Sequence, residues 1–400
     1  MIVLAGADLV LPDRIVERGT LVVRDGRIEA IEPRVVDGPV GAIRVDCSGH
    51  VIVPGFVDVH VHGIEGIDAL DGGNAVAEMA RRLPKYGVTA FCPTSVACGP
   101  QTLSDLLAAV TAARLSPAPR SARVLPAHLE SNFINPDWNG AQPRQCLRLP
   151  PRGSEKFEVG SESGDFNATD ILEVIAAHRA ATGIVTLAPE LPGGLDLVRA
   201  LVAAGHRVSI GHTGATYEEA MAAIAAGARH ATHLFNRMSP PTSRSPGVVG
   251  AVLESDAVAA EIICDGFHVH PALVAVALRA KGAARLMAIT DGTAGSGLPA
   301  GSRARLGAQQ IIVTERTAEL EDGTLAGSVL TMDVAFRRLV RENGVTLAEA
   351  VRLCSTTPAA ELGLMDVGSL EAGRTADLVV LGPGLAVRQT YLAGSAALEH

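Results

Sequence analysis

Six side chains of the types that bind divalent metal ions follow short apolar segments of the chain. His60 and His62 are two residues apart, so in an extended strand both side chains point to the same face. His128 and Glu130 share a face for the same reason. Imidazole and carboxylate ligands that converge and leave an open position are typical of a catalytic zinc or similar ion. The candidate ligands are His60, His62, Glu130, His212, His233 and Asp291.

A divalent ion in such a site has a definite chemistry. It lowers the pKa of a bound water from about 15.7 towards 7 and polarises a carbonyl group. The carboxylate of Asp291 is placed to take a proton from that water and to hand it to a departing amine. The residues therefore predict hydrolysis of a carbon–nitrogen amide bond, although an Asp in this place also serves as a plain ligand or a helix cap.

A single histidine near a strand end is usually only packed or hydrogen-bonded, and roughly one in ten binds a metal. We therefore expect structural roles for the histidines outside the candidate set. Six ligand-type residues at the ends of five separate strands are much harder to explain by coincidence. The histidines expected to be structural are His50, His178, His206, His230 and His270.

The elements that position these residues lie in a repeating unit of short apolar strand, loop and amphipathic helix, over residues 53–364. Eight such units predict a closed parallel (β/α)8 barrel of the TIM type, whose active site lies at the carboxyl ends of the strands. An open doubly wound sheet is the alternative, but no glycine-rich nucleotide-binding motif follows any strand. The expected strands are residues 55–63, 88–95, 123–130, 183–190, 207–213, 228–235, 259–266 and 285–292.

Both ends of the chain have a different texture. Residues 1–52 and 365–397 alternate apolar and polar residues between turn signals, which is typical of β-strands. Neither end has enough strands to be stable alone, so we expect one small β-sandwich domain built from both rather than two unrelated caps. A β-hairpin insertion is expected near residues 303–325, and residues 398–400 are interpreted as an expression-vector remnant.

Composition excludes several classes of partner. The net charge of −9 and the 3% of aromatic residues disfavour a nucleic-acid partner. No uninterrupted apolar run reaches membrane-spanning length, so no membrane partner is expected. The six cysteines are scattered without a paired pattern, which indicates reduced thiols and a cytoplasmic protein.

Longer motifs extend over nearly the whole chain. They are PGFVDVHVHG, HLESNFIN, ICDGFHVHP, ITDGTAGSGLPAG, LAGSVLTMD and, most specifically, the block GHTGATYEEAMAAIAAGARHATHLFNRM at residues 211–238. These motifs resemble those of the N-acetylglucosamine-6-phosphate deacetylases of the amidohydrolase superfamily. The resemblance implies a barrel of the metallo-dependent hydrolase type. It also implies a small-molecule substrate, an amino-sugar phosphate that loses acetate from its 2-amino group.

The resemblance implies roles for particular residues as well. Glu130, His212 and His233 would hold the principal metal, and Asp291 would be the general base and acid. His60 and His62 match members that hold a second ion, so we expect one or two divalent ions per subunit, zinc first and iron, manganese or cobalt as alternatives. The expected substrate-binding residues are Ser131, Gln142, Asn236, Arg237, Arg244 and His268.

Arg244 matches a residue that reaches the active site of a neighbouring subunit, which implies a homodimer. Its loop, residues 239–247, is stiffened by prolines and lies directly downstream of His233. Without the resemblance, an Arg among Pro and Ser is usually a solvated surface charge, and the same holds for Arg237. The position of the loop after a candidate ligand raises both residues above that background.

The chain departs from the family pattern in loops expected to face the substrate. Ser131-Asn132 replace a common Gly-Pro, Gln142 replaces a His, Arg237 replaces an Ala, and Gly292-Thr293 replace a common Ala-Met. A Gln still donates a hydrogen bond to a carbonyl or hydroxyl group but cannot become a cation. Because the metal ligands are unchanged, the reaction class is expected to hold while the identity of the sugar stays open.

The residues are compatible with three classes of function. We expect deacetylation of N-acetylglucosamine 6-phosphate, with the galactosamine epimer or another N-acyl amino-sugar phosphate as the near alternative. A cyclic amidase or N-acyl amino-acid hydrolase of the same superfamily often uses a carboxylated Lys on the fourth strand, and residues 183–190 contain no Lys. A non-catalytic metal- or sugar-phosphate-binding protein would not need the proton-transfer group of Asp291.

Overall fold

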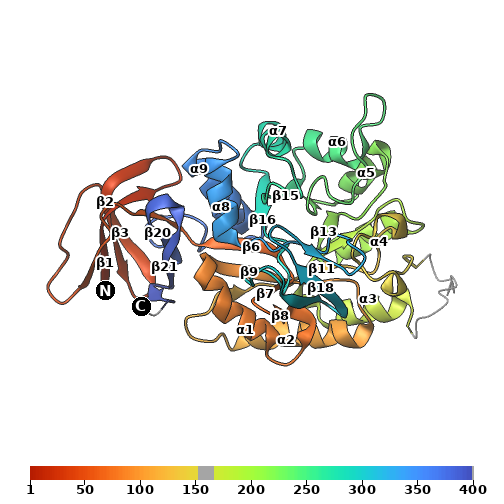
Figure 1. Ribbon diagram of the computed structural model, residues 1–400, viewed down its shortest axis with the longest axis horizontal. Coiled ribbons are helices and arrows are strands. Elements are labelled where there is room, and N and C mark those ends of the chain that lie inside the picture. Colours follow the sequence, from red (N-terminus) through yellow and green to blue (C-terminus); the bar gives the residue numbers. More distant parts are fainter. Residues whose placement is uncertain (152–165, 399–400) are drawn as a thin grey trace.

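Parallel strands form a nearly closed ring at the centre of the computed structural model, which describes residues 1–151 and 166–398 (Figure 1). The first strand of the ring pairs with the second and returns to the eighth through a bridge between Val61 and Gly292. The predicted (β/α)8 barrel is therefore confirmed. Its strands are β6 (Phe56–Val61), β9 (Val88–Ser95), β10 (Arg123–Val124) with β11 (Ala127–Glu130), β12 (Thr182–Leu187), β13 (Arg207–Ile210), β14 (His230–Ala231), β15 (Ala259–Ile263) and β16 (Leu286–Ile289).

Helices cover the outside of the ring, so the strands are buried on both faces, as their near-continuous apolar sequences require. Among the described residues, no helix is both long and apolar enough to cross a membrane. The helices are α1 (Ala75–Arg82), α2 (Pro100–Leu115), α3 (Ala168–Ala177), α4 (Gly194–Ala203), α5 (Tyr217–Ala225), α6 (Gly247–Glu254), α7 (Pro271–Lys281), α8 (Met332–Arg341), α9 (Leu347–Val351) and α10 (Thr357–Glu361).

A second sheet stands beside the barrel and takes strands from both chain ends (Figure 1). β20 pairs antiparallel with β5, so the two ends share one hydrogen-bonded sheet around their own apolar core. Of the three final residues interpreted as a remnant, Glu399 and His400 lie outside the described part of the chain. The strands are β1 (Ile2–Val10), β2 (Ile15–Arg24), β3 (Arg27–Glu32), β4 (Ile43–Asp46), β5 (Val51–Pro54), β20 (Leu378–Leu381), β21 (Val387–Leu392) and β22 (Ser395–Ala396).

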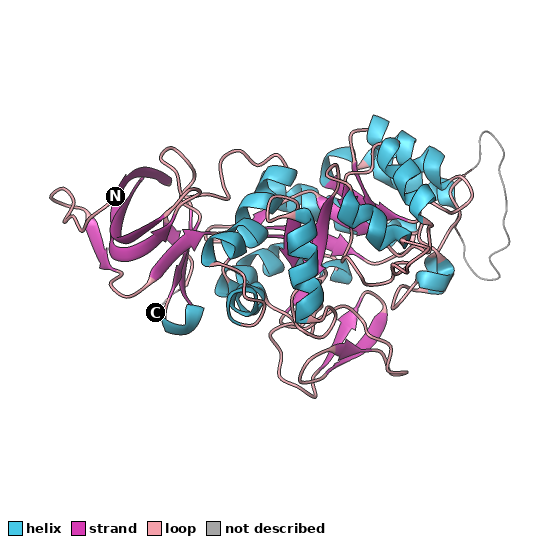
Figure 2. Ribbon diagram, turned by 90° about the horizontal axis from the view of Figure 1, so that it is seen from above, coloured by secondary structure: helices cyan, strands magenta, loops and turns pink. Residues whose placement is uncertain are grey.

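The insertion after the eighth barrel strand forms a separate small sheet below the barrel in Figure 2. A single hairpin was expected, but three antiparallel strands are present: β17 (Arg303–Leu306), β18 (Gln309–Val313) and β19 (Ala318–Glu319). The third strand pairs because a short turn, closed by the Thr314 amide donating to the Thr317 carbonyl at 2.8 Å, brings the chain back. A two-stranded ribbon, β7 (Gly63–Ile64) with β8 (Ile67–Asp68), follows β6.

Candidate metal centre

Three groups of ligand-type side chains lie in the described part of the chain, and one of them, His60 with His128 and Glu261, shares His60 with another. Three side chains from different strand ends form the group that we call triad one: Glu130, His212 and His233. Glu130 ends β11, and each histidine follows its strand by two residues. Glu130 Oε1 lies 3.0 Å from His212 Nε2 and 2.9 Å from His233 Nε2, and the two nitrogens are 3.1 Å apart. One oxygen and two nitrogens therefore surround a single point.

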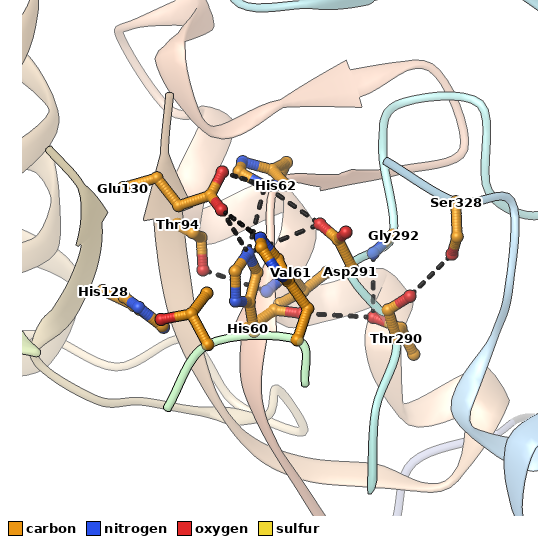
Figure 3. Close-up of polar contacts among 12 residues, drawn as sticks. His60, Val61, His62, Thr94, His128, Glu130, Thr290, Asp291, Gly292 and Ser328 are labelled. Atoms are coloured by element: carbon orange, nitrogen blue, oxygen red, sulfur yellow. Dashed lines mark hydrogen bonds and ion pairs between the residues drawn. The ribbon is translucent and has the colours of Figure 1, made fainter. Parts of the chain in front are cut away.

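The second group, triad two, consists of His60, His62 and Asp291 (Figure 3). His60 lies in β6 and His62 directly follows it, and both point inward as their spacing predicted; Asp291 follows β16 by two residues. The Nε2 atoms of His60 and His62 are 3.2 Å apart. Asp291 Oδ1 lies 3.4 Å from His60 Nε2 and 3.2 Å from His62 Nε2.

Glu130 joins the two triads. Its Oε1 belongs to triad one, whereas its Oε2 lies 3.4 Å from His62 Nε2 of triad two (Figure 3). The same Oε2 accepts a hydrogen bond of 2.5 Å from Gln142 Nε2. The six candidate ligands therefore form one continuous centre.

The arrangement fits divalent ions. His212 Nδ1 donates to the carbonyl oxygen of Trp138 at 2.9 Å, so its Nε2 carries a lone pair that faces the carboxylate of Glu130. Two such acceptors repel each other unless a proton or a cation lies between them. Ligands about 2.0–2.1 Å from a tetrahedral zinc ion are about 3.3 Å apart, close to the separations observed within both triads.

The centre attracts positive charge strongly. Burial alone lowers the pKa of His62, but contacts with Asp291 and Glu130 outweigh it and raise this pKa to about 10. For His233, burial is likewise outweighed by Glu130, and the pKa rises to about 9. Protons and metal ions would therefore compete for the same nitrogens.

Three of the candidate ligands have a strained backbone. The φ angles of His212, His233 and Asp291 are 49°, 32° and 48°, in the left-handed region that side chains other than glycine rarely adopt. Each such residue costs on the order of 1–3 kcal/mol, which the surrounding structure must offset. Strain at three strand ends that meet at one point is typical of a functional site.

A pocket opens over the centre and is walled in part by the insertion, through Leu306 of β17 and Leu325 in the segment after β19. Four of the predicted substrate-binding residues line it: Gln142, Asn236, Arg237 and His268. The other lining residues are His62, Glu130, Gly140, Ala141, His212, His233, Asp291 and Gly327.

Gln142 lies closer to the ligands than its sequence position indicated. Its Nε2 donates to Glu130, and its Oε1 accepts from the backbone amide of Ala97 at 2.7 Å. Both ends of the amide are therefore engaged, and the side chain is buried. A neutral Gln in this place supports the orientation of the bridging carboxylate as well as facing the pocket.

Ser131 and Arg244 do not line the pocket of their own chain. The Ser131 hydroxyl is buried and donates to the Thr186 carbonyl at 2.6 Å, a contact within the barrel. Arg244 is exposed on the loop between β14 and α6. Its predicted role therefore requires a second copy of the chain.

Sequence reasoning missed two supports of the ligands. Glu261 Oε2 lies 2.9 Å from His60 Nδ1, and the only signal was an acid within the apolar strand AAEII of β15. The Trp138 carbonyl that orients His212 gave no signal, because any residue type supplies a carbonyl. His128 shares its predicted face with Glu130, but burial lowers its pKa to about 4, so its ring is neutral.

Known proteins resemble this chain over nearly its whole length. The sequence model of the Amidohydrolase family matches residues 51–397. The N-acetylglucosamine-6-phosphate deacetylase of Lysinibacillus sphaericus is 35% identical over 95% of this chain and 96% of its own length. The N-acetylgalactosamine-6-phosphate deacetylase of Escherichia coli O157:H7 is 32% identical over 94% and 97%.

Solved structures agree with these sequence matches. A Mycobacterium smegmatis N-acetyl-D-glucosamine-6-phosphate deacetylase mutant, in complex with N-acetyl-D-glucosamine-6-phosphate, superposes with a TM-score of 0.87 at 32% identity. The match covers 100% of this chain and 99% of that one.

The two triads predict different effects of ligand removal. Replacing His212 by Ala should lower the content of the principal metal, because triad one loses one of its three ligands. Replacing His60 by Ala should leave that metal largely in place and remove the second ion. Elemental analysis of the purified variants measures both. Equal metal loss in the two variants would contradict the division into two sites.

Proposed function

The chain belongs to the N-acetylglucosamine-6-phosphate deacetylases of the amidohydrolase family, and on that premise we propose that it hydrolyses N-acetylglucosamine 6-phosphate to glucosamine 6-phosphate and acetate. The observation that carries the proposal is the Glu130-bridged centre at the base of a pocket that Arg237 and His268 also line. A hydrolytic metal centre and groups suited to an anionic sugar thus open onto the same space.

The family implies a divalent metal, and we propose zinc, held by triad one, with a second ion held by triad two. A bound ion of this kind supplies Lewis acidity, which activates water and polarises the acetyl carbonyl. The nitrogen and oxygen donors of both triads are those that zinc uses in catalytic sites.

Asp291 is the proposed proton carrier. Its carboxylate is buried, lines the pocket and is aligned by His60 and His62. It accepts a proton as the oxygen of water adds to the acetyl carbon. It then gives that proton to the sugar nitrogen as the carbon–nitrogen bond breaks, so amine and acetate leave.

The outer part of the pocket is proposed to bind the sugar and its phosphate. Asn236, Arg237 and His268 line it, and His268 is fixed by its Nδ1 contact of 2.6 Å with Asp265. A guanidinium offers two aligned donors to a phosphate, which suits Arg237 and, from a second subunit, Arg244. We propose a homodimer on this ground. We also propose a cytoplasmic location, which the six unpaired cysteines support.

Acetate release from a panel of N-acetyl sugars tests the function. We expect turnover of N-acetylglucosamine 6-phosphate, loss of turnover after chelation and recovery with a divalent ion. The galactosamine epimer belongs in the panel because one relative carries that activity in its name. Faster turnover of N-acetylgalactosamine 6-phosphate would change the proposed substrate to that sugar. Full activity in metal-free protein would refute the metal-dependent mechanism.

Asp291→Asn keeps the size of the side chain and removes the basic carboxylate. We expect substrate binding to stay largely intact and kcat to fall by at least ~10²-fold, the usual scale for a lost acid–base group. Steady-state kinetics at saturating metal measures the effect. A kcat near the wild-type value would assign proton transfer to another residue.

Arg244→Ala should weaken binding of the substrate's phosphate group. Loss of a charge-assisted contact worth about 2–3 kcal/mol raises KM roughly 30- to 150-fold for the phosphorylated substrate. An unphosphorylated analogue is the control and should change little, because it offers no group for the guanidinium.

Mixing the Arg244→Ala and Asp291→Asn subunits tests whether Arg244 acts across the dimer. A mixed dimer contains one site with both an intact Asp291 and the neighbour's Arg244, so at substrate concentrations below the raised KM its activity should exceed that of either variant alone. No recovery despite demonstrated subunit exchange would place Arg244 outside the neighbouring site.

A further inference from the structure

Glu261 is a carboxylate buried in the barrel interior, beneath triad two. It lies in β15 between apolar neighbours, and its exposed fraction is 0%. Its Oε2 lies 2.9 Å from His60 Nδ1. Its Oε1 has no hydrogen-bond partner among the described residues. A charged carboxylate in such a place is destabilised by the loss of water unless a positive charge lies close to it.

The surroundings of Glu261 offer no cationic side chain in hydrogen-bond contact within the described structure. The nearest other ring nitrogen is His128 Nδ1, 3.6 Å from Oε1. That nitrogen already donates to the Val59 carbonyl at 3.0 Å, and His128 Nε2 is bonded to the Thr186 hydroxyl at 2.8 Å. Both nitrogens of His128 are therefore used, and His60 is the one ring that Glu261 engages directly.

This contact decides which nitrogen of His60 faces the metal centre. The carboxylate accepts a hydrogen bond from the Nδ1–H of His60, so Nε2 presents its lone pair to His62 and Asp291. In triad one, His212 has the corresponding contact with a neutral carbonyl, that of Trp138. The two triads therefore differ in the charge behind their oriented histidine.

The difference matters because of the carboxylates within each triad. Triad one contains Glu130, which remains a ligand throughout the proposed reaction. In triad two the only carboxylate is Asp291, which becomes neutral when it takes the proton. Glu130 Oε2 also lies 3.4 Å from His62 Nε2, and a further permanent carboxylate behind His60 would add to the negative charge near the second ion during that step.

We propose that Glu261 is a positioning residue for the second metal ion, acting through His60 by fixing its ring and adding negative charge behind it. The inference rests on the proposed metal-dependent function and concerns only the second ion. Replacing a residue that hydrogen-bonds to the second nitrogen of a metal-binding histidine typically lowers metal affinity by about 10- to 100-fold.

Glu261→Gln tests the charge. The amide oxygen can still accept from His60 Nδ1 and the volume is unchanged, so the principal loss is the negative charge. We expect the zinc-loaded wild-type protein to hold two ions per chain by elemental analysis. In the variant, competition with a chromophoric chelator should show the second zinc bound about 10- to 100-fold more weakly and the first unchanged. A proportionate excess of zinc should restore the second ion.

Glu361→Gln is the matched control. Glu361 is also a carboxylate facing the barrel, but it pairs with Arg285 at 2.6 Å and lies 3.5 Å from His230 Nε2. Its loss should leave both zinc affinities within about threefold of wild type, a limit well below the 10-fold effect expected of a ligand-supporting partner. If Glu261→Gln does not fold, Glu261→Asp keeps the charge, shortens the reach to His60 and should weaken the second ion selectively.

The outcomes separate the two claims. Wild-type protein that holds no metal would overturn the proposed function and this inference together. A wild type with a single ion, or equal affinities for the second ion in wild type and Glu261→Gln, would overturn the inference and leave the function in place. Equal weakening of both ions in Glu261→Gln would also overturn it, because a general loss of structure has that effect.

Discussion

Several carboxylates are buried together in the barrel interior, where water is excluded. The rest of the site depends on which cations balance their negative charge. Glu130, Glu261 and Asp291 are all buried inside the ring, and in the described part of the chain the ionisable groups that contact them are imidazoles rather than lysines or arginines. Carboxylates in such a place need cations, which are either protons on the imidazoles, as the raised pKa values of His62 and His233 indicate, or metal ions that replace those protons. The centre is thus built for ions that arrive from solution.

The parallel ring makes this concentration geometrically simple. Every strand points its carboxyl end to the same side, so residues separated by up to 231 positions, from His60 to Asp291, arrive at one point. The ring closes there through the Asp291 amide, which donates to the His60 carbonyl at 2.9 Å. The hydrogen bond that closes the barrel therefore also holds Asp291 next to His60, the last and first of the candidate ligands in the sequence.

Much of the fold and of the candidate ligand set could be predicted from sequence, because both follow from short repeats. The period of two in β6 placed His60 and His62 on one face, and the strand–helix repeat placed the other ligands at strand ends. Contacts between distant backbones left no such signal. No local pattern encodes the turn that pairs the third strand of the insertion. Nor does one encode the partners in two hydrogen bonds, from His212 to the Trp138 carbonyl and from Ser131 to the Thr186 carbonyl.

The pairing of β5 with β20 has a consequence for the order in which the molecule is made. Some 320 residues separate Pro54 from Leu378, and a ribosome that adds about 5–20 residues per second needs roughly 16–65 s to synthesise them. During that interval one edge of β5 has no partner, because β1 occupies only the other. The sheet that contains β5 is thus begun before the barrel and completed only after it. A nascent chain must keep this open edge of β5 from pairing with other strands until β20 has been made.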